Sequence, residues 1–150
     1  MLNRAMKWLT TVVLVTASTM AAAQTPQNAR YQVNPIVGTV FDGMTKLTWQ
    51  RDVNAIPAMS RIDASRYCAS LALAGKRWRL PTVVELWSLV DLGHVSPMID
   101  PVAFADTPAE NFWSSSTHLG SRDLAWSVGF DAGSKHGHRM DLTIRVRCVR

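Results

Sequence analysis

Apolar and polar residues alternate from residue 124 to the end of the chain, and this period of two predicts β-strands. Residues 124–131 (LAWSVGFD) are predicted to form a half-buried strand. Its inward side chains are expected to be Leu124, Trp126, Val128 and Phe130. Residues 132–141 (AGSKHGHRMD) are expected to turn, and residues 142–149 (LTIRVRCV) to return antiparallel to the first strand.

The returning strand would place different side chains on its two faces. Cys148 lies on the apolar face together with Ile144 and Val146, so we expect it to point into the protein. Arg145 and Arg147 lie on the opposite face. We therefore expect these two arginines to be solvated charges.

The middle of the chain has a helical period instead. Residues 60–75 (SRIDASRYCASLALAG) place apolar side chains at helical spacing, with Cys68 on the inner face. Ser60 and Asp63 resemble a capping pair at the start of this helix, and Gly75 suits its end.

A second helix is predicted directly after Pro81. Thr82, followed three residues later by Glu85, is the sequence pattern of a capping box. Four side chains share the apolar face of this helix, and its end is expected near Gly93. They are Val83, Leu86, Trp87 and Val90. Just before the helix, Trp78 is expected in the core and Arg79 in a structural ion pair.

The remaining segments complete an α+β order. Residues 37–50 contain two short β-rich runs around the turn residues DGMTK, which predicts a hairpin. Residues 93–117 are rich in Pro, Asp and Ser and are expected to be mostly loop, with one short strand at 112–114. The resulting order of hairpin, helix, helix, long loop and hairpin favours an α+β fold.

The first 23 residues have the pattern of a secretory signal peptide. A basic start containing Arg4 and Lys7 precedes a thirteen-residue, mostly apolar run and then small residues that include Ala21 and Ala23. The run is too short to span a bilayer comfortably. We therefore predict a signal peptide at 1–23, a flexible lead-in at 24–30 and one domain at 31–150, without a membrane span in the mature chain.

Composition adds a modest charge and one pair of cysteines. Residues 1–23 hold two of the 16 basic residues and no acidic one, so the 127 mature residues carry 14 basic and 11 acidic residues, a net charge of +3. This charge permits attraction to anionic partners without demanding it. Cys68 and Cys148 in an exported chain predict a disulfide. A nucleophilic thiol beside an idle cysteine is the alternative.

Six stretches of the chain, in this order, resemble the Lcl C-terminal domain family of exported bacterial proteins, named for the end domain of a collagen-like adhesin. They are GTVFDGMTKLTWQRD, YCASLALAGKRWRLPTVVELWSLVD, IDPVAFADTP, FWSSS, AWSVGF and VRCVR. The most specific of them is WRLPT followed by Glu85 and Leu86. The resemblance covers about residues 30–150.

This resemblance implies a C-type-lectin-like fold, related to the domain of formylglycine-generating enzymes, in which two helices pack on short antiparallel strands beside a long loop region. In such folds a disulfide commonly ties the first helix to the last strand, and Cys68 and Cys148 occupy those two elements. The Glu-Pro-Asn and Gln-Pro-Asp tripeptides of calcium-dependent sugar-binding lectins are absent. Nor do the later aspartates form a calcium-loop string. We expect no calcium site.

The sequence offers little for catalysis. Cysteines joined in a disulfide cannot act as nucleophiles, and no Gly-x-Ser-x-Gly elbow is present. His136 and His138 lie two residues apart, but two ligands do not make a metal site. We therefore expect a protein that is not an enzyme, with no cofactor and no metal.

Two functions from different classes remain. The first is a ligand-binding or adhesin-like module, for which the resemblance suggests anionic, sulfated polysaccharide. Its candidate ligand-binding residues, expected in loops near the last hairpin, are Arg122, Lys135, His136, His138 and Arg139. The second is a structural or envelope-stabilising protein that docks on another protein. No nucleic-acid partner is expected. A binding module should expose aromatic and basic side chains together, whereas a docking protein should expose one large apolar patch.

Overall fold

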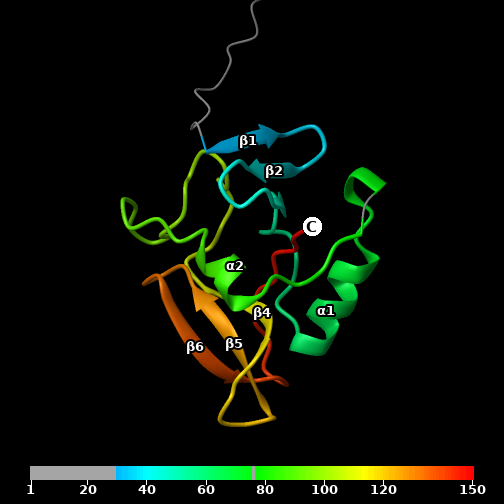
Figure 1. Ribbon diagram of the computed structural model, residues 1–150, viewed down its shortest axis with the longest axis vertical. Coiled ribbons are helices and arrows are strands. Elements are labelled where there is room, and N and C mark those ends of the chain that lie inside the picture. Colours follow the sequence, from blue (N-terminus) through cyan, green and yellow to red (C-terminus); the bar gives the residue numbers. More distant parts are fainter. Residues whose placement is uncertain (1–29, 76) are drawn as a thin grey trace, which may run out of the picture.

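The computed structural model describes residues 30–75 and 77–150 (Figure 1). The predicted signal peptide, residues 1–23, and residues 24–29 of the predicted lead-in lie outside the described residues. The elements in chain order are β1 (Tyr31–Asn34), β2 (Thr39–Asp42), β3 (Thr48–Gln50), α1 (Arg61–Ser70), the 3₁₀ turn η1 (Leu73–Gly75), α2 (Val83–Trp87), β4 (Asn111–Thr117), β5 (Leu124–Gly129) and β6 (Ser134–Arg139). No helix in this part of the chain is both long and apolar enough to cross a bilayer.

The strands form two antiparallel sheets of three strands each, in the orders β1-β2-β3 and β4-β5-β6. The predicted hairpin at 37–50 is confirmed, because β2 pairs with β3 and Val40 lies opposite Trp49. β1, which was not predicted as a strand, adds to this hairpin. With two helices packed against the two sheets, the predicted α+β class is confirmed.

Both helices begin where local sequence predicts, because side chains at their starts satisfy free backbone amides. At α1, the Ser60 hydroxyl accepts a hydrogen bond from the Asp63 amide at 3.2 Å. At α2, the Thr82 hydroxyl accepts from the Glu85 amide at 3.2 Å, while the Glu85 carboxylate accepts from the Thr82 amide at 2.7 Å. The predicted capping box is therefore confirmed.

Both helices end earlier than the sequence predicts. α1 ends at Ser70, and Gly75 belongs instead to the separate 3₁₀ turn η1, as its last residue. α2 ends at Trp87 instead of near Gly93, because the Asp91 amide donates to the Met98 carbonyl at 3.0 Å. This hydrogen bond within the loop after α2 replaces the bond to Trp87 that would have continued the helix.

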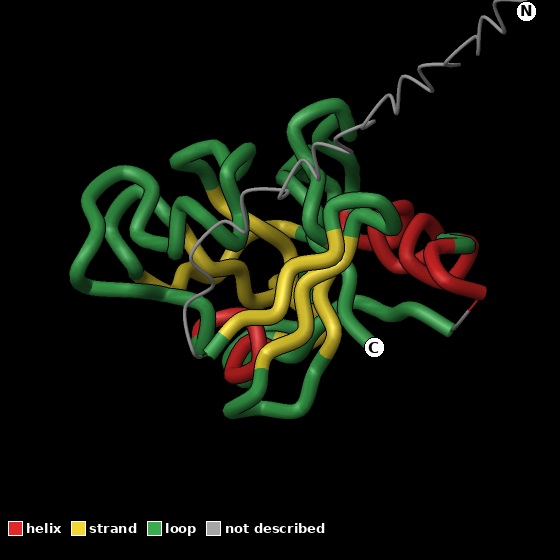
Figure 2. The backbone as a smooth tube through the Cα atoms, turned by 90° about the horizontal axis from the view of Figure 1, so that it is seen from above, coloured by secondary structure: helices red, strands yellow, loops and turns green. Residues whose placement is uncertain are grey.

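The buried side chains form two clusters, one on each side of the β4–β6 sheet, which separates α1 from α2 (Figure 2). Phe112 and Trp113 are adjacent in β4 and point into different clusters, as successive strand residues do. Phe112 belongs to the same cluster as Leu86 of α2, and Trp113 belongs to the same cluster as Cys68 of α1. Trp78 is buried in the second cluster, as predicted.

The C-terminal segment is not the strand that returns against β5. That place is taken by β6, formed from residues predicted to turn. Residues 142–150 instead run between the two sheets (Figure 1) and pair through isolated bridges. Arg145 pairs with Phe112 of β4, whereas Val149 pairs with Trp49 of β3. The segment therefore joins the two halves of the fold.

The disulfide prediction is confirmed. Cys68 and Cys148 are joined, their Cα atoms lie 5.4 Å apart, and both side chains are fully buried. The bond ties α1 to the C-terminal segment across 80 residues of sequence. In the chain-entropy model, closing a loop of this size stabilises the fold by about 4.5 kcal/mol.

The prediction that Arg147 is a solvated charge is wrong. Its side chain is completely buried, and its guanidinium donates to the carbonyls of Gln50 and Arg51 at 2.8 and 3.0 Å. It also lies 4.6 Å from the ring centroid of Phe104. The reason is the position of the segment, because at Arg147 it lies between the two sheets and is covered on both sides.

Arg145 is also not simply solvated. Its guanidinium pairs with both carboxylate oxygens of Glu110 at 3.0 Å and donates to the Ile56 carbonyl at 3.1 Å. Arg79 makes the structural ion pair that the sequence predicts, with Glu85 at 2.7 and 2.8 Å.

The predicted inward face of β5 is partly wrong. Ala125 and Ser127 are fully buried, whereas Trp126 is only half-buried. Both faces of β5 are covered near Val128, since α2 packs on one side and the C-terminal segment on the other. Toward the other end of the strand α2 no longer covers its face, and Trp126 reaches the surface.

Candidate binding face

The candidate ligand-binding residues lie mainly on a strand and not in loops. Lys135, His136, His138 and Arg139 all belong to β6, and only Arg122 lies in a loop, between β4 and β5. The expected position in loops is therefore wrong for four of the five. The cause is the pairing of β6 with β5, which a sequence rich in glycine and histidine does not indicate.

Strand geometry divides these residues between two faces. Lys135 and Arg139 lie on one face of the sheet, and His136 and His138 lie on the other, because successive strand residues alternate. Lys135 is paired in register with Val128, whose side chain packs toward α2. The structure therefore does not bring the five cations together at one site.

The face that carries Lys135 also carries two half-buried aromatic side chains, Trp126 and His118, that the sequence did not place at a binding face. Trp126 lies opposite Gly137 in register, and the His118 ring lies 4.6 Å from the Trp126 ring. A Cβ atom at Gly137 would approach the His118 ring to 3.0 Å. Glycine at this position therefore leaves the space in which His118 packs against Trp126.

Trp87, the last residue of α2, lies at the other end of the same face. Its indole nitrogen donates to the Gly133 carbonyl at 3.0 Å, and the Lys135 ammonium lies 4.5 Å from the centroid of its ring. The side chain is 44% exposed. We call the four side chains Trp87, Lys135, His118 and Trp126 the aromatic strip.

The charge around the strip is weaker than the sequence suggests. Arg139, two residues beyond Gly137, makes a two-pronged ion pair with Asp141 at 2.7 and 3.1 Å. Arg122 is exposed in the β4–β5 loop and is followed by Asp123. Lys135 is the cation that directly contacts an aromatic ring of the strip.

The two histidines on the opposite face make internal contacts. His138 lies with its Nδ1 atom 2.9 Å from the Ser127 hydroxyl and packs edge-on against Trp113. Its partial burial, followed by the neighbouring His136, lowers its pKa below the usual value. Because Ser127 is completely buried, no substrate can reach its hydroxyl as a nucleophile.

The arrangement of the strip is suited to binding and offers no reacting pair. Flat aromatic rings present an apolar surface, and a cation beside them attracts an anionic group. Within residues 30–75 and 77–150, no group of three His, Cys, Asp or Glu side chains could hold a metal ion.

Sequence reasoning missed Trp126 because the alternation placed it with the inward residues. It missed Trp87 and His118 because their positions depend on contacts with Lys135 and Gly137, which lie far away in the sequence. The one local signal was Gly137, a glycine within an otherwise polar run, which in a strand often marks close packing against a neighbour.

A family model agrees with the resemblance found in the sequence. The model of the Lcl C-terminal domain matches residues 38–150, which include every element from β2 to the C-terminal segment. The resemblance predicted from the sequence motifs is therefore confirmed. No curated protein matches this sequence.

Proposed function

The chain belongs to the Lcl C-terminal domain family over residues 38–150, and we propose that it is an exported, non-enzymatic module that binds anionic, sulfated polysaccharide. The observation that carries the proposal is the aromatic strip. It combines the exposed Trp87 and the half-buried Trp126 with a cation on one face of the β4–β6 sheet. This combination is the one expected of a binding module, not of a structural protein.

The strip offers both an apolar surface for sugar rings and a cation for their anionic groups. The rings of Trp87 and Trp126 can stack on the apolar faces of sugar rings, while the Lys135 ammonium can pair with a sulfate or carboxylate. Lys135 and Gly137, which lies opposite Trp126, are two residues apart on one strand, or about 7 Å. An extended chain of sugars could therefore contact several members of the strip at once.

Binding through this face should be weak and salt-dependent. Lys135 is exposed, and Arg139 is already paired with Asp141, so few unpaired charges face the ligand. Exposed charges are screened beyond about 8 Å at physiological salt. Stacking on the tryptophans should persist at salt concentrations that remove the charge contribution.

Retention on a heparin column tests the proposal. The wild-type mature protein should be retained at low salt and elute as salt rises. Lys135→Gln should elute at clearly lower salt, and Trp126→Ala should reduce retention at every salt concentration. Circular dichroism of each variant establishes that the fold is intact.

A matched control comes from α1, which packs against the opposite side of the same sheet. Arg66→Gln removes the same charge from a side chain that is 77% exposed and should elute like the wild type. Absence of retention of the wild-type protein at low salt, or an equal shift in Arg66→Gln and Lys135→Gln, would contradict the proposal.

Export is the second part of the proposal, and two observations support it. The first 23 residues have the order of a signal peptide, and the two cysteines form the disulfide that an oxidising compartment favours. N-terminal sequencing of the mature protein should begin at Gln24. Protein that retains Met1 and stays in the cytoplasm would contradict this part.

The alternative is a protein that docks on an envelope partner. It is favoured by exposed apolar side chains in the loop after α2, where Leu92 and Val95 are 80% and 82% exposed. The double change Leu92→Ser with Val95→Ser should then abolish co-purification with an envelope protein. The same change should leave heparin retention unaltered if the aromatic strip is the binding face.

A further inference from the structure

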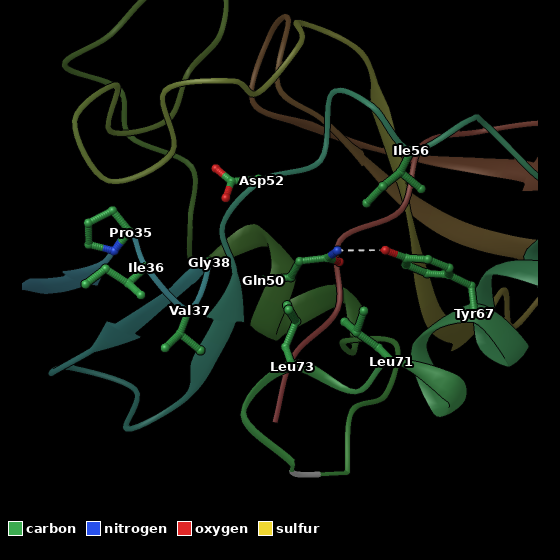
Figure 3. A pocket seen from close by; sticks show the side chains of 10 residues that line it. All are labelled: Pro35, Ile36, Val37, Gly38, Gln50, Asp52, Ile56, Tyr67, Leu71 and Leu73. Atoms are coloured by element: carbon green, nitrogen blue, oxygen red, sulfur yellow. Dashed lines mark hydrogen bonds between the residues drawn. The ribbon is translucent and has the colours of Figure 1, made fainter.

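A cavity of about 360 Å³ lies on another part of the molecule, between the β1–β2 turn and the end of α1 (Figure 3). One wall is formed by Pro35, Ile36 and Val37 of the turn. The opposite wall is formed by Leu71 and Leu73, which follow α1. Its volume lies at the lower end of the range for small-molecule sites.

The floor of the cavity is polar. Gln50 is 3% exposed, and its side-chain amide donates to the Tyr67 hydroxyl at 2.8 Å, as the dashed line in Figure 3 shows. Its amide oxygen accepts from the Cys148 backbone at 3.2 Å. Because the Tyr67 hydroxyl accepts from Gln50, its own proton is available to donate. The floor therefore presents one hydrogen-bond donor, the Tyr67 hydroxyl, among apolar walls.

The rim of the cavity carries a hydrogen-bond acceptor, whereas the floor carries a donor. Asp52 lies across the cavity from Tyr67 (Figure 3), and its carboxylate is paired with Arg51 at 3.0 Å. The carboxylate would repel an anion, and its existing pairing with Arg51 weakens attraction for a cation. A ligand with an N–H or O–H group can still donate to it.

Both walls are fixed to the floor before any ligand binds. On one side, Gly38 adopts a φ of +74° and its carbonyl accepts from the Arg51 amide at 2.9 Å, which closes the turn onto the chain after β3. On the other side, the Leu71 amide donates to the carbonyl of the disulfide-bonded Cys68 at 3.2 Å, and the Leu73 carbonyl accepts from the Trp78 indole at 2.9 Å. A site that needs no rearrangement loses less affinity to ordering.

From this combination we propose that the cavity binds a small neutral amphiphile that carries an amide. Its apolar chain would lie between Ile36 and Leu73. Its carbonyl would accept from the Tyr67 hydroxyl, and its N–H would donate toward Asp52. The proposal is independent of polysaccharide binding, because the aromatic strip contains none of these residues.

N-hexylacetamide is a suitable probe, and its binding can be followed by nitrogen-15 chemical shifts of the mature protein. We expect saturable shifts at Tyr67, Leu71 and Leu73 with a dissociation constant of about 1 mM, since ten heavy atoms give limited affinity. Heptanoate and hexylammonium, which carry the same hexyl chain on a charged head, should bind at least about fivefold more weakly.

Two variants and one control locate the site. Tyr67→Phe keeps the ring and removes the donor, so it should weaken N-hexylacetamide binding about three- to tenfold. Leu73→Arg should abolish binding by filling the cavity. Leu119→Arg places the same side chain on a fully exposed loop position and should bind like the wild type.

Three results would overturn the proposal: absence of saturable shifts in the wild type, unchanged binding in Leu73→Arg, or heptanoate binding as tightly as the amide. If Leu73→Arg does not fold, Leu73→Trp provides the same test by occupying the cavity with an apolar side chain. Failure here would leave heparin retention unaffected, so the two proposals can be distinguished.

Discussion

Replacement of Arg147 should reveal how much one buried cation contributes to this fold. Its guanidinium donates to the carbonyls of Gln50 and Arg51 and to the Thr107 hydroxyl at 2.6 Å. Arg147→Ala removes these donors and the packing against Phe104. A buried acceptor left without its donor costs about 1–3 kcal/mol, and the lost packing adds to this.

Part of that loss is offset, because Arg147→Ala also removes the cost of burying a positive charge. Burial lowers the pKa of Arg147 to about 10, below its value in the unfolded chain. The cost of the charge is therefore fully present at neutral pH and is relieved only as pH rises through about 10 toward the unfolded value. When this cost of the buried charge is subtracted, we expect Arg147→Ala to lower the free energy of unfolding by about 2–4 kcal/mol.

Urea unfolding of the disulfide-intact protein at pH 7 measures this loss. Arg147→Met keeps most of the packing and should lose only about 1–2 kcal/mol, which remains measurable if the alanine variant does not fold. Arg145→Ala is the control in the same segment, where a half-exposed pair with Glu110 should contribute less than about 1 kcal/mol. Stability of Arg147→Ala within about 0.5 kcal/mol of the wild type would refute the reasoning.

Three further predictions concern the disulfide, a helix cap and a histidine. Replacing Cys68 and Cys148 together by alanine should lower the free energy of unfolding by about 2–5 kcal/mol in urea, and alkylation of the native protein should label neither sulfur. Thr82→Ala should lower the free energy of unfolding by about 1 kcal/mol without altering heparin retention, because the Thr82 hydroxyl only caps α2. Unchanged stability with lost retention would count against this prediction. The pKa of His138, followed by NMR, should lie below 6.5, so the stability it contributes is present above pH 6.5 and is lost as pH falls through its folded value. His138→Gln should flatten that part of the stability profile.

Local sequence determined the features of this protein that depend on neighbouring residues. The caps at Ser60 and Thr82 were predictable because each hydroxyl meets an amide three residues away. The hairpin at 37–50 and the inward position of Cys68 followed from short-range periods. The alternation at the end of the chain also placed Cys148 inward correctly.

Tertiary structure decided what depends on partners far away in sequence. Alternation can tell which residues share a face, but it cannot tell whether each face meets solvent or a second layer. Arg147 is buried because its segment lies between two sheets, and Trp126 is half-exposed because α2 ends before covering it. The pairing of β6 with β5 likewise brought Lys135 beside Trp87, residues 48 positions apart, so the aromatic strip exists only in the folded chain.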